Sequence, residues 1–240
     1  MFPIRDTIPS RNPPVAVWAV ISACAFVFLF ELVLPQYKLE ALFFQAGLVP
    51  ARYSHAPLSE WFSPRLLFPF FACMFLHGGW MHIIGNMWSL WLFGDNVEDR
   101  MGPARFLVFY VLCGLVAGAV HVALHPASQV PVVGASGAIA GVMGAYLVMF
   151  PLARVIVLVP VLFLPLFFEL PAVLFIGLWY LSQLFNGMFS LAGGGSFGGV
   201  AWWAHVGGFA AGVVLHRFFL LPRGRRRRPF ADEFGLEGAW

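Results

Sequence analysis

Two long stretches without a charged side chain constrain this chain most strongly. No Asp, Glu, Lys or Arg occurs between Arg105 and Arg154, nor between Glu169 and Arg217. A helix that crosses a bilayer needs about 20 mostly apolar residues, so each stretch has room for two such helices. Polar and apolar residues do not alternate in these stretches as they do in the strands of a membrane barrel. We therefore predict an all-α, polytopic membrane protein.

The composition agrees with this class. Apolar residues make up 60% of the chain and charged residues only 10%, against roughly 45–50% and about 25% in a soluble domain. These values exclude a disordered chain, a fibrous repeat and an ordinary soluble enzyme. Cys24, Cys73 and Cys113 all have apolar neighbours, and they form neither a disulfide framework nor a metal-binding pattern. We expect no cofactor.

The apolar runs predict six membrane-spanning helices, with approximate limits 14–34, 79–95, 104–124, 135–152, 168–188 and 201–220. Residues 35–78 form one long connection with room for short helices at the membrane interface. The start of the fifth helix is the least defined, because prolines interrupt the apolar residues 153–167. The chain then divides into a cytoplasmic N-terminal segment (1–13), a six-helix domain (14–220) and a basic cytoplasmic tail (221–240).

The basic residues predict the orientation of these helices. With six spans and both termini in the cytoplasm, 11 of the 14 Lys and Arg residues lie on the cytoplasmic side. The 3 others, Lys38, Arg52 and Arg65, lie in the long outer connection. This split is the one that membrane proteins favour. Beside a membrane, the run from Arg225 to Arg228 indicates contact with anionic lipid rather than with nucleic acid.

Polar side chains inside the predicted spans gather at one depth. The second, fourth and sixth helices all begin on the outer side. At about 1.5 Å of rise per residue, a hydroxyl, two imidazoles and an amide from these helices can all lie within roughly 10 Å of the outer interface. They belong to Ser136, His205, His82 and Asn86, and His77 lies just before the second helix. Polar groups in a membrane are costly and tend to mark function.

These residues have the chemistry of an acyl-transfer site. The Ser136 hydroxyl is a weak nucleophile until a base such as His205 takes its proton. The developing oxyanion needs donors, which the amide of Ser136 at a helix N-terminus and the side chains of His82 and Asn86 can supply.

Small residues allow the fourth and sixth helices to approach closely. Gly137 and Gly141 are four residues apart, as are Gly208 and Gly212, and such stripes let helices pack tightly in lipid. We expect this packing to bring Ser136 next to His205.

These motifs resemble the rhomboid family of intramembrane serine proteases. The matching residues, in order, are His77, His82 and Asn86, then Glu98, Arg100 and Gly102, then Gly134, Ser136 and Gly137, and finally His205, Gly208 and Gly212. The resemblance implies a dyad of Ser136 and His205 that cleaves peptide bonds in or near transmembrane helices of membrane-protein substrates. It also implies oxyanion roles for His82 and Asn86, a supporting role for His77, and a water-filled cavity capped by residues 189–200.

The resemblance also implies a location. A six-helix core without an added helix is similar to the bacterial members, which implies the inner membrane and a site toward its outer face.

The sequence departs from the family's pattern at two places. Phe68 and Pro69 stand where many members have Trp-Arg. Ala140 stands where many members have a tyrosine that stacks on the catalytic imidazole, so the group that orients His205 stays open. Glu98 and Arg100 are expected to form a structural ion pair.

Two other functions compete with this interpretation. A transporter or channel needs polar residues that continue toward the cytoplasmic side, and below Ser136 and His205 the fourth and sixth helices offer only Tyr146 and His216. A non-catalytic membrane-protein binding module of related fold is the second alternative. A zinc site made of His77, His82 and His205 is disfavoured, because no carboxylate accompanies these residues at this depth to act as a base.

Overall fold

The computed structural model describes residues 2–54, 56–161, 163–192 and 200–222. It has a helix at each of the six predicted positions: α1 (Val15–Val33), α5 (Trp80–Met101), α6 (Pro103–Leu124), α7 (Ser136–Met149), α8 (Ala172–Ala192) and α9 (Trp202–Phe219). Among the described residues, α1, α6 and α8 are long and apolar enough to cross a membrane. Helix α7 is apolar but has only 14 residues. The protein is therefore mostly helical and membrane-embedded.

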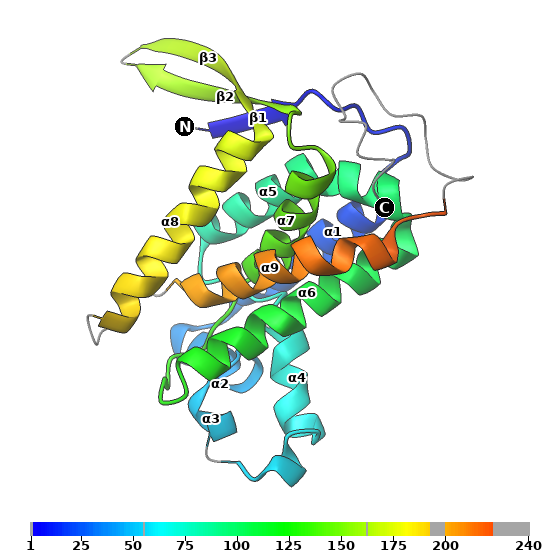
Figure 1. Cartoon of the computed structure of the whole chain (residues 1–240). Helices are drawn as coiled ribbons and strands as arrows, with labels where there is room; N and C mark the ends of the chain where they lie inside the picture. The colour runs from blue at the N-terminus through cyan, green and yellow to red at the C-terminus, as the bar shows by residue number, and fades with distance from the viewer. Residues whose placement is uncertain (1, 55, 162, 193–199, 223–240) are drawn as a thin grey trace.

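Helix α7 is the most enclosed of these helices. It packs against α5, α6, α8 and α9 (Figure 1). Every residue of α7 from Gly137 to Tyr146 is buried. The ten residues of this run are small or apolar apart from Tyr146, which lets the surrounding helices approach α7 closely.

The predicted close packing of α7 on α9 is confirmed. A methyl group added at Gly208 would overlap the carbonyl oxygen of Gly137, and one added at Gly212 would overlap that of Gly141. The two backbones are therefore in direct contact. This contact sets the height and rotation of α9 relative to the first turn of α7.

The long connection contains the expected short helices. They are α2 (Gln36–Ala46), α3 (Ala51–Ser54), the 3₁₀ turn η1 (Leu58–Glu60) and α4 (Pro64–Ala72). In Figure 1 they lie at the end of the molecule opposite the β-strands. The buried Tyr53 ties them together, because its hydroxyl donates to the carbonyl oxygen of Leu66 at 2.8 Å.

The expectation of an all-α fold was wrong in one region. Strands β1 (Phe2–Asp6), β2 (Arg154–Val161) and β3 (Leu164–Pro171) form an antiparallel sheet in the order β1-β2-β3. The N-terminal segment thus pairs with a hairpin, and α8 begins at Ala172 rather than near residue 168. In the hairpin, alternate valines in β2 and three prolines explain the strands, because β-branched residues favour strands and proline breaks a helix.

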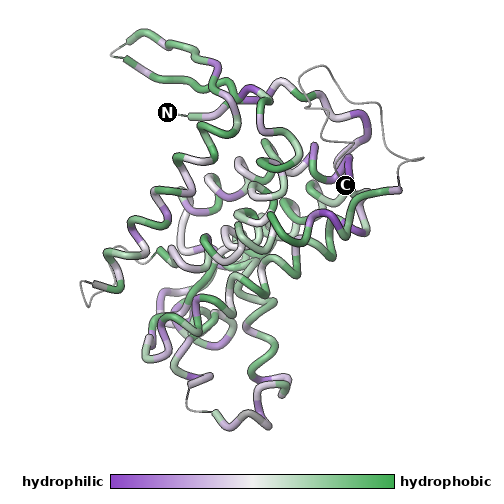
Figure 2. Tube along the Cα trace, in the orientation of Figure 1, coloured by the Kyte–Doolittle hydropathy of each residue, from purple (hydrophilic) through white to green (hydrophobic). Residues whose placement is uncertain are grey.

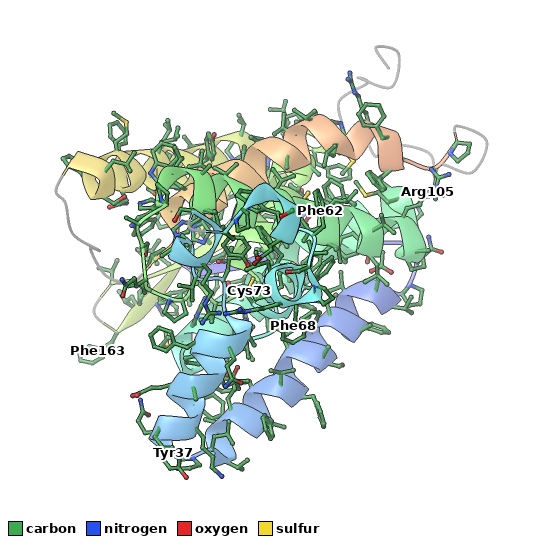
Figure 3. The ribbon with its side chains drawn as sticks, turned by 90° about the horizontal axis from the view of Figure 1, so that it is seen from below. Tyr37, Phe62, Phe68, Cys73, Arg105 and Phe163 are labelled. Carbon is green, nitrogen blue, oxygen red and sulfur yellow. The ribbon has the colours of Figure 1, made fainter. Side chains whose placement is uncertain are left out.

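The hairpin and α8 carry much of the exposed apolar surface. Figure 2 shows hydrophobic residues along most of both elements. Phe163 is fully exposed, and in Figure 3 it projects from the outer tip of the hairpin. Tyr37, at the start of α2, and Arg105, at the start of α6, lie at opposite corners of that view. Apolar patches of this extent are expected where a protein meets lipid.

Three segments named in the sequence analysis fall wholly or partly outside the described residues. These are the capping segment 189–200, of which residues 193–199 are not described, the cytoplasmic N-terminal segment, of which residue 1 is not described, and the basic tail, from residue 223 onward.

Candidate active site

The centre of the site is a hydrogen bond between α7 and α9. His205 Nε2 lies 2.8 Å from Ser136 Oγ. Ser136 is the first residue of α7, and His205 lies in the first turn of α9, where it is 8% exposed. Gly208, one turn further along α9, packs on Gly137, the neighbour of Ser136. The glycine contact therefore places the imidazole beside the hydroxyl.

Gly134 turns the chain into α7. Its φ of +124° is a conformation that residues with a side chain rarely adopt. Its amide donates to the carbonyl oxygen of Cys73 at 2.8 Å, which anchors the turn to the segment that precedes α5. A Cβ atom at this position would lie 2.6 Å from His82 Nε2. Only glycine therefore fits between the imidazole of His82 and the start of α7.

Two donors from α5 converge on this turn. The amide of Gly78 donates to His82 Nδ1 at 3.3 Å, so in the neutral ring the proton is on Nε2, the atom that faces Gly134. Asn86 Nδ2 is also near Gly134 and is buried without a hydrogen-bond partner within the described part of the chain. Both nitrogen atoms therefore lie beside Gly134, two residues before Ser136.

His77 supports His82 from behind. Its ring packs edge-on against His82, with ring centroids 5.2 Å apart, and its Nδ1 donates to the carbonyl oxygen of Phe75 at 3.1 Å. Its backbone amide donates to the two carboxyl oxygens of Glu31 at 3.1 and 3.3 Å. The buried Glu31 of α1 thus holds the segment that leads into α5, a role that the sequence did not reveal.

Gln183 is the residue of this site that sequence reasoning missed. Its Oε1 lies 2.8 Å from His205 Nδ1, on the side of the ring opposite Ser136. It comes from α8 and is 4% exposed. The sequence offered a signal, since an amide in an apolar membrane helix is costly unless it has a partner, but Asn186 on the same helix carries the same signal. Two aromatic rings lie near His205, those of Trp179 and Trp202, with centroids 5.9 and 6.3 Å away.

Glu98 and Arg100 lie at the other end of α5, away from Ser136. The two Glu98 oxygens accept hydrogen bonds from the amides of Ala16 at 3.0 Å and Val17 at 2.9 Å. These amides belong to the first turn of α1, whose N–H groups have no partners within the helix. Glu98 therefore holds the start of α1, a contact that the sequence did not predict, and its ion pair with Arg100 stays a prediction. The Arg100 guanidinium lies 5.7 Å from the ring centre of Phe150.

Comparisons with known proteins point to one family. The model of the rhomboid domain matches residues 64–222, more than half of the chain. YdcA of Bacillus subtilis is 39% identical over 90 residues, which cover 38% of this chain and 42% of YdcA. The RHOMBOID-like protein 5 of Arabidopsis thaliana is 38% identical over 76 residues, or 32% of this chain and 25% of the relative.

A third relative matches a longer stretch at lower identity. The rhomboid protease GlpG of Salmonella newport is 28% identical over 123 residues, or 50% of this chain and 39% of the relative. The chain thus spans less than half of the length of each of these relatives. Since the family model covers the segment that contains α5 to α9, the protein belongs to the rhomboid family.

Proposed function

We propose that the protein is an intramembrane serine endopeptidase that hydrolyses peptide bonds in or near transmembrane helices of membrane proteins. The observation that carries this proposal is the 2.8 Å contact between Ser136 Oγ and His205 Nε2. Membership of the rhomboid family, together with a relative named as a rhomboid protease, supports the same reaction.

In the first half of the reaction, His205 Nε2 takes the proton from Ser136 Oγ as the oxygen attacks the substrate carbonyl carbon. The negative charge that develops on the carbonyl oxygen is met by N–H donors. His205 then gives the proton to the nitrogen of the leaving amine, and the carbon–nitrogen bond breaks. In the second half, water replaces the amine and releases the acid from Ser136 by the same proton transfers.

The oxyanion donors in this proposal are the amide of Ser136 and the side chains of His82 and Asn86. Three facts support the assignment. The Ser136 amide is in the first turn of α7 and so lacks a partner within the helix. The Nε2 proton of His82 faces Gly134, and Asn86 Nδ2 is buried without a partner among the described residues. An unpaired buried donor is unfavourable in the free protein and becomes favourable when an oxyanion forms.

We propose the inner membrane of a bacterium as the location. With six membrane-spanning helices, the N-terminal segment 1–13 and the tail 221–240 both lie in the cytoplasm. Ser136 and His205 then lie near the outer face. The 11 to 3 distribution of basic residues supports this orientation. A helical substrate already has its backbone hydrogen bonds satisfied, so cleavage requires local unwinding. Substrates with helix-weakening residues near the outer end of a span should be preferred.

The experiment combines chemical labelling with cleavage. The purified protein in proteoliposomes is treated with a fluorophosphonate, and mass spectrometry locates the adduct, while a reporter membrane helix measures cleavage. We expect the adduct on Ser136, and no cleavage by Ser136→Ala or His205→Ala variants that keep the melting temperature of the wild type. Cleavage by the double variant would contradict the proposed mechanism. If the proteoliposomes instead showed solute flux, and Ser136→Ala left that flux unchanged, the transporter alternative would be favoured.

A further inference from the structure

We propose that Gln183 on α8 is the positioning residue of the dyad, fixing both the orientation and the protonated nitrogen of the His205 ring. The inference rests on the proposed proteolytic function. It fills the place left open by Ala140, where the sequence lacks an aromatic ring against the imidazole.

The amide group of Gln183 is held in one orientation. Its Nε2 lies 3.1 Å from the carbonyl oxygen of Trp179 and 2.9 Å from Ser182 Oγ. A backbone carbonyl only accepts hydrogen bonds, so the atom that faces it must be the NH₂ group. If the amide were turned around, its oxygen would face the oxygen of Trp179 and both would be acceptors. The Trp179 carbonyl therefore decides which end of Gln183 faces His205.

The end that faces His205 is the oxygen. Gln183 Oε1 lies 2.8 Å from His205 Nδ1, and an amide oxygen only accepts, so Nδ1 must carry the proton. In a neutral ring Nε2 then has a free lone pair. Nε2 is the atom that contacts Ser136 Oγ. One backbone carbonyl on α8 thus sets, through two hydrogen bonds, the tautomer that can act as the base.

Burial makes this arrangement decisive. Gln183 is 4% and His205 is 8% exposed, so water has little access to Nδ1 or to Oε1. Trp179 contributes a second contact, since its ring lies at 33° to the imidazole. The opposite tautomer would put a proton on Nε2, and the ring could not then accept one from Ser136. An amide achieves this selection without placing a second charge in the membrane, where a charged side chain is costly.

The test compares two substitutions at Gln183 with a matched position on the same helix. Gln183→Leu removes the acceptor. Gln183→Glu keeps an acceptor and adds a charge. Asn186 is the control, because it is exposed and its amide donates to the Ser182 carbonyl oxygen of its own helix at 2.7 Å. Each variant is measured for kcat and KM of reporter cleavage across pH, and for the ¹⁵N signals of the His205 ring in micelles.

We expect Gln183→Leu to lower kcat by on the order of 10²-fold or more with little change in KM, because the ring loses its preference for the reactive tautomer. The ¹⁵N spectrum of this variant should lose the single Nδ1–H form. Gln183→Glu should remain active and should move the acidic limb of the pH–rate profile to higher pH, since a carboxylate favours the protonated ring. Asn186→Leu and Asn186→Glu should change neither the tautomer nor that limb.

Two results would overturn the proposal. One is a Gln183→Leu variant with wild-type kcat and an unchanged ring spectrum. The other, which serves if that variant does not fold, is a folded Gln183→Glu variant whose pH–rate profile coincides with that of the wild type. Failure of the proposed function looks different, because fluorophosphonate would then fail to label Ser136 in the wild-type protein itself.

Discussion

At the scale of single residues, the site depends on which atoms of each side chain donate and which accept. His82 and His205 illustrate this, because neutral imidazoles are directed into opposite states by their neighbours. The Gly78 amide leaves a proton on Nε2 of His82, and Gln183 leaves a lone pair on Nε2 of His205. The His82 ring can therefore donate to an oxyanion, and the His205 ring can act as a base. Composition alone does not distinguish these two states.

Asn86 is one of the proposed oxyanion donors, and its contribution can be measured by substitution. Replacing Asn86 with Leu, which is of similar size, removes the unpaired donor beside Gly134. We expect kcat to fall by on the order of 10²-fold while KM changes little, because the lost hydrogen bond forms only in the transition state. The thermal midpoint should not fall, since the side-chain nitrogen has no partner to lose among the described residues. A rise in KM at unchanged kcat would instead assign Asn86 to substrate binding.

At the scale of elements, the contact of α7 with α9 positions the dyad. Replacing Gly208 with Val forces side-chain atoms into the Gly137 carbonyl group, so the helices must separate. We expect a loss of stability of about 1–3 kcal/mol and a loss of cleavage, because overpacking displaces backbone and His205 lies one turn away. Thermal unfolding in micelles and the reporter assay measure the two effects.

Gly177 on α8 is the matched control for that substitution. No atom lies within 4 Å of a Cβ placed there, and Gly to Ala in a helix normally adds stability. Gly177→Ala should therefore leave cleavage unchanged and the unfolding midpoint equal or higher. If Gly208→Val behaved in the same way, the glycine contact would not be what holds the dyad together.

At the scale of the whole molecule, the predicted orientation can be measured directly. A reporter that is active only outside the cytoplasm should be active when inserted after Pro126, between α6 and α7, and inactive when fused after Leu221, which follows α9. The reason is the excess of basic residues on the cytoplasmic side. A reporter active at Leu221 would place the end of α9 outside and would contradict both the six-helix topology and the assigned depth of Ser136.

Features that depend on local composition and spacing can be predicted from the amino-acid sequence. Long uncharged runs place the helices, and glycines four residues apart predict the face on which α7 meets α9. Those helices in turn bring Ser136 to His205, so this pair was predictable before any coordinates. Each of these signals lies within one segment of chain, where periodicity can be read.

Contacts that depend on how separate elements are rotated against one another become visible only in the folded protein. The mainly apolar composition of residues 153–167 fits either a helix or a strand. Their pairing with β1 and with each other shows that they form strands. Glu31 and Gln183 are polar residues in mainly apolar helices, and nothing in their own segments tells which group they face. A rotation of α8 about its axis would turn Gln183 away from His205. The hydrogen bond to His205 therefore exists only because neighbouring helices fix that rotation.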